Sequence, residues 1–345
     1  MTRVKRQVTI RDIAERTGFS FQTASRVLNG KAGLHKASTV RKIEKAAAEL
    51  GYVQNLYAKA MKGGRTWSVG IIIDPFSDSF TKDIFCGAHD ELMKRHYLPI
   101  LLLHSGDSHD EELVKRLAAR RVEGLILRPN PNPEESKAIA SAIERCHMPV
   151  VSVDYDLTPS RKYDFVGSAD EHGGHLAAEH LLELGHRRLA GLFVPVESLT
   201  LRQKGFEAAV AKRTGVTPPI VLSDWALGES EPCYLRIKEL LKNKDAPTAI
   251  FAGGDFMLPA IYRAAMDLGR CIPAELSVIG FGDVDFAEHL APPATTLKQD
   301  AYEIGVQSAR FVITRIENPE SAMAARHLRF EPRLILRGST APLDA

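Results

Sequence analysis

The stretch SFQTASRVLNG, from Ser20 to Gly30, separates into two faces when it is placed on a helix at about 100° per residue. One face is small and apolar and contains Thr23, Ala24, Val27 and Leu28. The other face is polar and contains Gln22, Ser25, Arg26 and Asn29, with Phe21 at its edge. No acidic residue lies in this stretch. The helix therefore presents amide, hydroxyl and guanidinium groups to a partner that an acid would repel.

Two further helices are predicted on either side of this one. Thr9 can cap the first, with Asp12 three residues on as in a capping box, and Gly18 can end it. Ser20 caps the second helix, so only a tight turn separates the two. The third runs through TVRKIEKAAAEL and ends at the following glycine. Two short helices joined by a glycine-containing turn, with a third for support, predict a helix-turn-helix over residues 7–53.

In a helix-turn-helix, the second helix enters the major groove of DNA with its N-terminal residues on base edges. Gln22 can form a bidentate pair with adenine, Arg26 can do so with guanine, and Phe21 can pack on a thymine methyl group. The charge distribution agrees with a polyanionic partner. Residues 1–65 carry a net charge of +10, whereas the rest of the chain carries −8. A solvated basic tail would lack the apolar periodicity of these helices.

From Trp67 onward, strand-like runs such as VGIII, PILLLH and AIFAG alternate with helical stretches such as DEELVKRLAARR. Alternating strands and helices predict parallel sheets with helices on both faces. About 280 residues is long for one such layer, so we expect two lobes. The predicted fold class is an all-α helix-turn-helix head joined to a two-lobed α/β parallel-sheet domain over residues 65–345.

Ligands of open α/β sheets bind beyond the carboxyl ends of the strands. The side chains that follow the predicted strands include acids, an arginine and aromatic rings, which suit a polyhydroxylated ligand. They are Asp74, Pro75, Phe76, His104, Arg128, Asp154, Asp224, Trp225, Asp255, Gly282, Asp283 and Asp285. Each also has a purely structural alternative, because Asp255 could cap a helix and Asp154 and Asp283 could form turns.

Several functional classes receive little support. No apolar run reaches transmembrane length, and MTRVKRQVTIRD lacks the apolar core of a secretory signal, so a cytoplasmic protein is expected. The four cysteines are widely spaced, which argues against a zinc site or disulfides. No phosphate-binding glycine motif follows a strand. The histidines at 172, 175, 180 and 186 fit surface or capping positions better than a metal site, and we expect no metal, no cofactor and no catalytic constellation.

The segments VTIRDIAERTGFSFQTASRVLNG and AAAELGYVQNLYAKAMKGGRT resemble the DNA-binding head of the lactose-repressor/galactose-repressor family of bacterial transcription regulators. The T-I-x-D-[IV]-A opening, the G-x-S-x-x-T-x-S-R-V-L-N core and the E-L-G-Y-x-x-N tail occur in the family's order and spacing. The resemblance implies that Phe21, Gln22 and Arg26 read bases. It also implies that Ser20, Thr23 and Ser25 contact phosphate or the turn, with core packing as the alternative for Thr23.

The resemblance further implies a hinge helix over residues 54–64 that folds only on DNA, paired with that of its dimer mate in the minor groove. Met61 stands where the family usually places a leucine that wedges between base steps. A plain interdomain linker is the alternative. The expected DNA contacts are thus Thr9, Ser20, Phe21, Gln22, Thr23, Ser25, Arg26, Asn29, Asn55, Ala58 and Met61.

The body resembles the family's effector-binding core, which is similar to the periplasmic sugar-binding protein fold, in AAEHLLELGHRRLAGL, PTAIFAGGD and PAELSVIGFGD. Arg202 matches the family's ligand arginine, Asp255 its second-lobe acid, and Trp225 a stacking position of some sugar-binding members. The expected effector contacts are Asp74, Phe76, Asp170, Arg202, Trp225, Asp255 and Asp283. Glycine at position 282 replaces the first acid of the common G-[FY]-D-D motif.

The sequence therefore predicts a homodimeric, ligand-responsive transcription regulator that binds near-palindromic operator DNA. It is expected to repress genes for the use of sugars or sugar acids until a small-molecule inducer releases it. No leucine heptads follow RLILRG, so a dimer is expected rather than a tetramer. The alternatives are a purine-responsive corepressor-dependent regulator of the same fold, a sugar-processing enzyme with a DNA-binding head, and a periplasmic solute receptor.

Overall fold

The computed structural model describes residues 8–29, 32–53, 65–75, 79–104, 110–129, 132–158, 162–225, 229–320 and 324–343. The chain divides into two compact units, Met1–Thr66 and Trp67–Ala345. The predicted hinge residues Asn55, Ala58 and Met61 lie outside the described residues, and so does Phe76. In the described part of the chain, no helix has the length and apolar character needed to cross a membrane.

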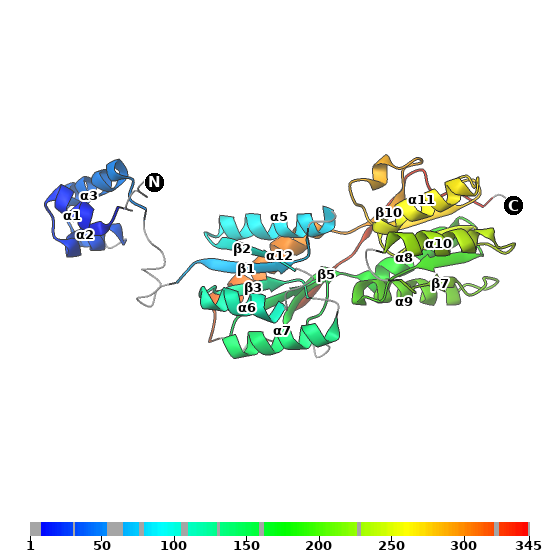
Figure 1. The fold of residues 1–345 in the computed structure, drawn as a ribbon, viewed down its shortest axis with the longest axis horizontal. Coiled ribbons are helices and arrows are strands. Elements are labelled where there is room, and N and C mark those ends of the chain that lie inside the picture. The colour runs from blue at the N-terminus through cyan, green and yellow to red at the C-terminus, as the bar shows by residue number, and fades with distance from the viewer. Residues whose placement is uncertain are drawn as a thin grey trace, which may run out of the picture. The chain divides into compact units, whose positions relative to one another are not determined.

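The N-terminal unit contains the helix-turn-helix that the sequence predicts. Its helices are α1 (Ile10–Thr17), α2 (Phe21–Leu28) and α3 (Ala37–Leu50), with a 3-10 turn at Ala32–Leu34 (Figure 1). The backbone N–H of Thr9 donates to the carboxylate of Asp12 at 2.7 Å and so begins α1. Gly18 ends α1 with a φ of 75°, a left-handed conformation that glycine adopts without strain.

A small apolar core holds the three helices together. Ile13 of α1, Ala24 and Val27 of α2 and Ile43 of α3 are buried against one another. Ala24 and Val27 belong to the apolar face that the sequence predicts for α2. Burying that face turns the opposite, polar face of the helix outward.

The second unit consists of two lobes, each built on a six-stranded sheet with helices on both faces (Figure 1). The sheet of the first lobe is parallel throughout and has the order β11-β5-β4-β3-β1-β2. Its strands are β1 (Ser68–Ile73), β2 (Leu98–Leu103), β3 (Gly124–Leu127), β4 (Val150–Val153), β5 (Asp164–Ser168) and β11 (His327–Phe330). Helices α5 (Ser79–Lys94) and α12 (Ala301–Glu317) cover one face, and α6 (Asp110–Ala119) and α7 (Pro133–Cys146) cover the other.

The sheet of the second lobe has the order β12-β10-β9-β8-β6-β7, and only the pairing of β12 with β10 is antiparallel. Its strands are β6 (Leu189–Leu192), β7 (Ile220–Leu222), β8 (Ala249–Ala252), β9 (Ser277–Gly282), β10 (Thr295–Lys298) and β12 (Arg333–Ile335). Its helices are α8 (Asp170–Glu183), α9 (Glu197–Ala211), α10 (Ser230–Lys242) and α11 (Leu258–Asp267), with 3-10 turns at Asp255–Met257 and Ala287–His289.

Three segments carry the chain between the two lobes in the described residues. They run from β5 to α8, from β10 to α12 and from β11 to β12. The side-chain amide of Gln299, in the second segment, donates at 2.8 Å to Oγ of Ser168, the last residue of β5, where the first segment begins. The carboxyl ends of strands from both sheets meet at these segments (Figure 1).

Helices α8 and α9 pack at unusually close range because a glycine of each faces the backbone of the other. A Cβ at Gly174 would overlap the carbonyl oxygen of Arg202, and a Cβ at Gly205 would overlap that of Glu171. The contact sets Asp170, the first residue of α8, beside the side chain of Arg202 on α9. Glycine at these positions is therefore required by packing rather than by backbone conformation.

We expect Gly205→Ala to lower the free energy of unfolding of the second unit by about 2–3 kcal/mol, because the methyl group must push two helices apart. Chemical denaturation followed by tryptophan fluorescence measures this, since both tryptophans, Trp67 and Trp225, lie in that unit. Gly33→Ala is the control, because a Cβ there meets nothing within 4 Å. An unchanged denaturation midpoint in Gly205→Ala would contradict the packing argument.

Candidate DNA-reading face and interlobe cavity

The outward face of α2 carries the side chains that the sequence predicts to read bases. Phe21 is 50% exposed although it is a large apolar residue, and Gln22 and Arg26 are exposed beside it. The helix packs on the core of the head through its apolar face, and the ring of Phe21 is not part of that contact. The exposed ring is therefore available to a binding partner. The three side chains lie within the first two turns of the helix, the part that approaches base edges in a helix-turn-helix.

The remaining predicted contacts in the head also have local structural roles. Ser20 Oγ accepts from the backbone N–H of Thr23 at 3.1 Å, and the two hydroxyls lie 2.9 Å apart. The side-chain amide of Asn29 donates to the carbonyl of Ser25 at 2.6 Å, which turns it back along the helix. Thr23 is half-buried, and both its backbone N–H and its hydroxyl lie within hydrogen-bond distance of Ser20 Oγ.

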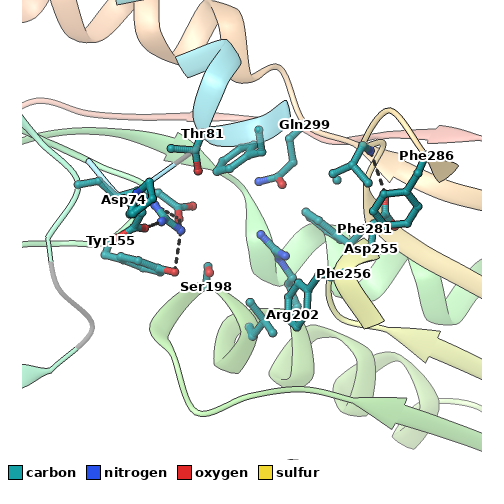
Figure 2. Close-up of a pocket in the computed structure, with 18 residues that line it drawn as sticks. Asp74, Thr81, Tyr155, Ser198, Arg202, Asp255, Phe256, Phe281, Phe286 and Gln299 are labelled. Carbon is teal, nitrogen blue, oxygen red and sulfur yellow. Dashed lines mark hydrogen bonds and ion pairs between the residues drawn. The ribbon is translucent and has the colours of Figure 1, made fainter. Parts of the chain in front are cut away.

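A cavity of about 410 Å³ lies between the two lobes of the second unit, and we call it the interlobe cavity (Figure 2). Asp74, Arg128 and Asp154 line it from the first lobe, at the carboxyl ends of β1, β3 and β4. From the second lobe, Arg202 reaches in from α9 and Asp255 lies just after β8. Four of these five residues follow strands and meet here because ligand sites of open α/β sheets form beyond the carboxyl ends of the strands, which we call the strand-end rule. Arg202 lies within α9 and was expected from the family resemblance.

Arg128 is held by two carboxylates on the first-lobe wall. It forms an ion pair with Asp74, and its Nε and Nη2 donate to Asp154 at 3.0 and 2.8 Å. Nη2 also donates to the hydroxyl of Tyr155 at 2.9 Å. The neighbouring acid and phenol keep the pKa of Arg128 above its usual value, although burial acts in the opposite direction.

Arg202 is held in a similar way on the second-lobe wall. Its Nε donates to Asp170 at 2.8 Å and its Nη1 donates to the carbonyl of Gly253 at 2.7 Å. The guanidinium lies over the ring of Phe281, 3.7 Å from the ring centroid. Burial raises the pKa of Asp170 to about 6, and the positive charge of Arg202 opposes that rise. Asp170 itself lies behind Arg202 and does not line the cavity.

Asp255 organises the loop that follows β9. Its carboxylate accepts from Thr296 Oγ1 at 2.9 Å and from the backbone N–H of Val284 at 3.2 Å. Burial raises its pKa to about 6, while these hydrogen bonds act to lower it. A Cβ at Gly280 would overlap the carboxylate, so the glycine leaves the room that Asp255 occupies.

Two predicted effector residues lie elsewhere. Trp225 is buried and lines a separate cavity of about 180 Å³ together with Cys233 and Met257. Within the described part of the chain, its indole Nε1 has no hydrogen-bond partner. Asp283 pairs with Lys298 at 3.0 Å and with Arg337 at 2.6 Å, and it is not among the residues that line the interlobe cavity. The strand-end rule predicts the edge of the sheet at which a residue lies, but it does not predict the direction in which the side chain points.

The cavity also contains residues that the sequence analysis did not select. Figure 2 shows Tyr155 near Asp74, Ser198 and Gln299 near the middle, and Phe256 and Phe286 near Asp255. Ser198 lies on α9, Phe256 lies in the 3-10 turn Asp255–Met257, and Gln299 lies in the segment between β10 and α12. Gln299 directly follows β10, so applying the strand-end rule to that strand would have found it.

Comparison with known proteins agrees with both units. Residues 9–55 match bacterial regulatory proteins of the lacI family, and residues 178–340 match the periplasmic binding protein-like domain. The HTH-type transcriptional repressor PurR of Edwardsiella ictaluri is 29% identical over 96% of this chain and 97% of its own length.

Two solved structures share the fold over most of the chain. The lac repressor dimer bound to operator and the anti-inducer ONPF has a TM-score of 0.84 and 25% identity, covering 97% of this chain and all of its own. A LacI family regulator from Enterococcus faecium with bound ribose has a TM-score of 0.70 and 28% identity, covering 80% of this chain and all of its own. This chain therefore belongs to the lacI family of bacterial regulatory proteins and is a ligand-responsive, sequence-specific DNA-binding transcription regulator.

Proposed function

We propose that this chain is a homodimeric repressor of genes for carbohydrate use, and that an inducer bound in the interlobe cavity releases it from operator DNA. The observation that carries the proposal is the convergence of Arg128, Arg202 and three carboxylates with aromatic rings in one cavity that both lobes line. Carboxylates accept from hydroxyl groups, and aromatic faces pack on the apolar face of a sugar ring. The ribose bound to the Enterococcus faecium relative supports this choice of ligand.

The link from ligand to DNA follows from the position of the cavity. A ligand that touches both lobes can favour one relative orientation of them, by no more than the difference in its affinity for the two states. The lobes already meet at the edges of the cavity. Lys82 of α5 lies 3.5 Å from the carboxylate of Asp285, and the backbone N–H of Asp156 donates to Glu197 at 3.0 Å. Reorienting the lobes would move the attachment points of the two heads of a dimer and change their fit to an operator.

A purine-responsive regulator is the second candidate. The relative from Edwardsiella ictaluri is named as a PurR repressor, and Phe80, Phe256, Phe281 and Phe286 place flat rings around the interlobe cavity. A purine base can stack between such rings. In that case the bound ligand would strengthen operator binding rather than release it.

We further propose that the chain acts in the cytoplasm, where operator DNA is found, and that it catalyses no reaction. The basic head argues against a periplasmic solute receptor. Turnover of a bound sugar would instead favour the enzyme alternative. The hinge role of residues 54–64, with Asn55, Ala58 and Met61 at the minor groove, remains part of the proposal on sequence grounds alone.

Base reading by α2 predicts that Arg26→Ala weakens binding to the cognate operator by about 1–3 kcal/mol and relaxes the base preference at one position of each half-site. Selection of bound sequences from a randomised half-site measures that preference. Arg41→Ala is the matched control, because it removes the same charge from an exposed position on α3. Unaltered selectivity in Arg26→Ala would refute the assignment.

A dimer is the expected assembly, because a single three-helix head is too small for tight operator binding and two heads match a two-fold symmetric site. Sedimentation velocity at micromolar concentration should give one species of about twice the 38.0 kDa chain mass. A monomer or a stable tetramer under those conditions would contradict the proposed assembly.

The inducer and the operator should each lower the protein's affinity for the other by the same factor, because binding free energies at two linked sites are reciprocal. If a sugar lowers the protein's affinity for operator by a given factor, operator should lower the protein's affinity for that sugar by the same factor. Calorimetry of sugar binding with and without operator DNA measures this. Arg202→Lys keeps a positive charge beside Asp170 and should weaken sugar binding yet still bind operator. Arg213→Lys, exposed after α9, should behave as wild type. Equal sugar affinity with and without operator would eliminate the mechanism.

A further inference from the structure

We infer that the interlobe cavity selects a neutral polyol, an uncharged sugar of monosaccharide size, and rejects sugar acids and sugar phosphates. The inference rests on the proposed function and narrows its ligand, because both the sequence pattern and the fold leave neutral sugars and sugar acids open. Four observations carry it: the balance of charge in the cavity wall, a donor of Arg202 and a buried acceptor of Asp154 that have no partner among the described residues, and the aromatic lining.

The wall of the cavity carries more acids than bases. Asp74, Asp154 and Asp255 line it, and Asp170 lies directly behind Arg202. Against these four carboxylates stand two guanidinium groups, Arg128 and Arg202. The wall and its immediate support therefore have a net charge of −2 when all six groups are ionised.

The two guanidinium charges are already neutralised by the protein. Arg128 is shared between two acids, and Arg202 has its own carboxylate partner. Two further cations whose partners or neighbours adjoin lining residues are paired as well, since Lys82 lies 3.5 Å from Asp285 and Arg329 lies 3.5 Å from Asp156. An anionic ligand would therefore meet surplus carboxylates without a spare cation in the described part of the wall.

Arg202 nevertheless keeps one donor for a ligand. Its Nε and Nη1 are used by Asp170 and Gly253, and among the described residues no group accepts from Nη2. A hydroxyl oxygen or a ring oxygen of a neutral sugar can accept from this atom. A carboxylate could accept as well, but it would add a third uncompensated negative charge to a partly desolvated site.

Asp154 supplies the matching acceptor. Its Oδ2 binds Arg128, whereas Oδ1 is buried and has no hydrogen-bond partner among the residues that the structure describes. Asp154 is 5% exposed and lines the cavity, so the unpaired oxygen calls for a donor from a ligand. A hydroxyl group is such a donor, whereas an ionised carboxylate or phosphate is not.

The rest of the lining fits the apolar face of a sugar. Phe80, Phe256, Phe281 and Phe286 contribute rings, and Leu199 contributes an aliphatic side chain. A cavity of about 410 Å³ is in the range of small-molecule sites and accommodates a single sugar ring. Carboxylate acceptors and aromatic rings from both lobes suit a ligand that is polar at its edge and apolar on its faces.

The first test compares neutral sugars with their acidic counterparts on the full-length protein. Calorimetry would use D-glucose, D-glucuronate and glucose 6-phosphate, D-galactose and D-galacturonate, and D-ribose and ribose 5-phosphate, with adenine and guanine as uncharged non-sugars. We expect a neutral sugar to bind about 100-fold more tightly than its anionic counterparts, because a negative charge added about 5 Å from a wall with more carboxylates than guanidinium groups is strongly repelled.

The second test changes the wall. Asp74→Asn removes one negative charge and should raise the affinity ratio of the anionic to the neutral sugar about tenfold. Asp154→Asn should weaken the neutral sugar about tenfold through loss of a charge-assisted hydrogen bond. Asparagine tolerates the φ of 66° at position 154, so this variant should fold. Asp245→Asn, on the exposed surface, is the matched control and should change neither value.

An acidic sugar that binds as tightly as its neutral counterpart would overturn the inference, and so would an unchanged ratio in Asp74→Asn. Binding of a purine base and of no sugar, or of no compound in the panel, would also overturn the assigned ligand class. Operator binding measured on the same preparation separates these results from failure of the proposed function. A protein that binds operator but prefers anions remains a regulator with a different ligand.

Discussion

The ion pair between Arg202 and Asp170 is the interaction on which the second-lobe wall of the cavity depends. Two charged groups at 2.8 Å, both almost fully buried, are stable only while each keeps its partner. The glycine-to-backbone contacts of α8 and α9 bring them together, because bulkier residues at Gly174 and Gly205 would separate the helices. Packing between two helices thereby sets the direction of a ligand-binding guanidinium.

The same arrangement recurs on the first lobe with different elements. Arg128 follows β3 and is fixed by acids that follow β1 and β4, its neighbours in the sheet. Each lobe therefore offers a guanidinium that its own carboxylates have oriented in advance. Because contacts within each lobe already orient its guanidinium, a ligand does not have to order either wall when it binds. Its binding free energy can then favour one relative orientation of the two lobes.

The predicted fold was confirmed because its signals are local. The capping box at Thr9, the left-handed glycine that ends α1 and the apolar face of α2 each depend on residues within one or two turns of helix. The alternation of strands and helices in the body is equally local, and parallel sheets follow from it. The strand-end rule then brought Asp74, Arg128, Asp154 and Asp255 to one cavity without knowledge of any contact.

The sequence by itself determined the two kinds of unit, the polar face of α2 and the edge of each sheet where a ligand site forms. It could do so because periodicity, capping and strand direction depend on residues that are close together in the sequence. Only the tertiary structure decided which side chains enter the cavity. Trp225 turns into a separate cavity and Asp283 into a pair with Arg337, while Tyr155, Ser198 and Phe286 line the site. The physical reason is that a side chain's direction depends on packing and charge partners contributed by residues far away in sequence.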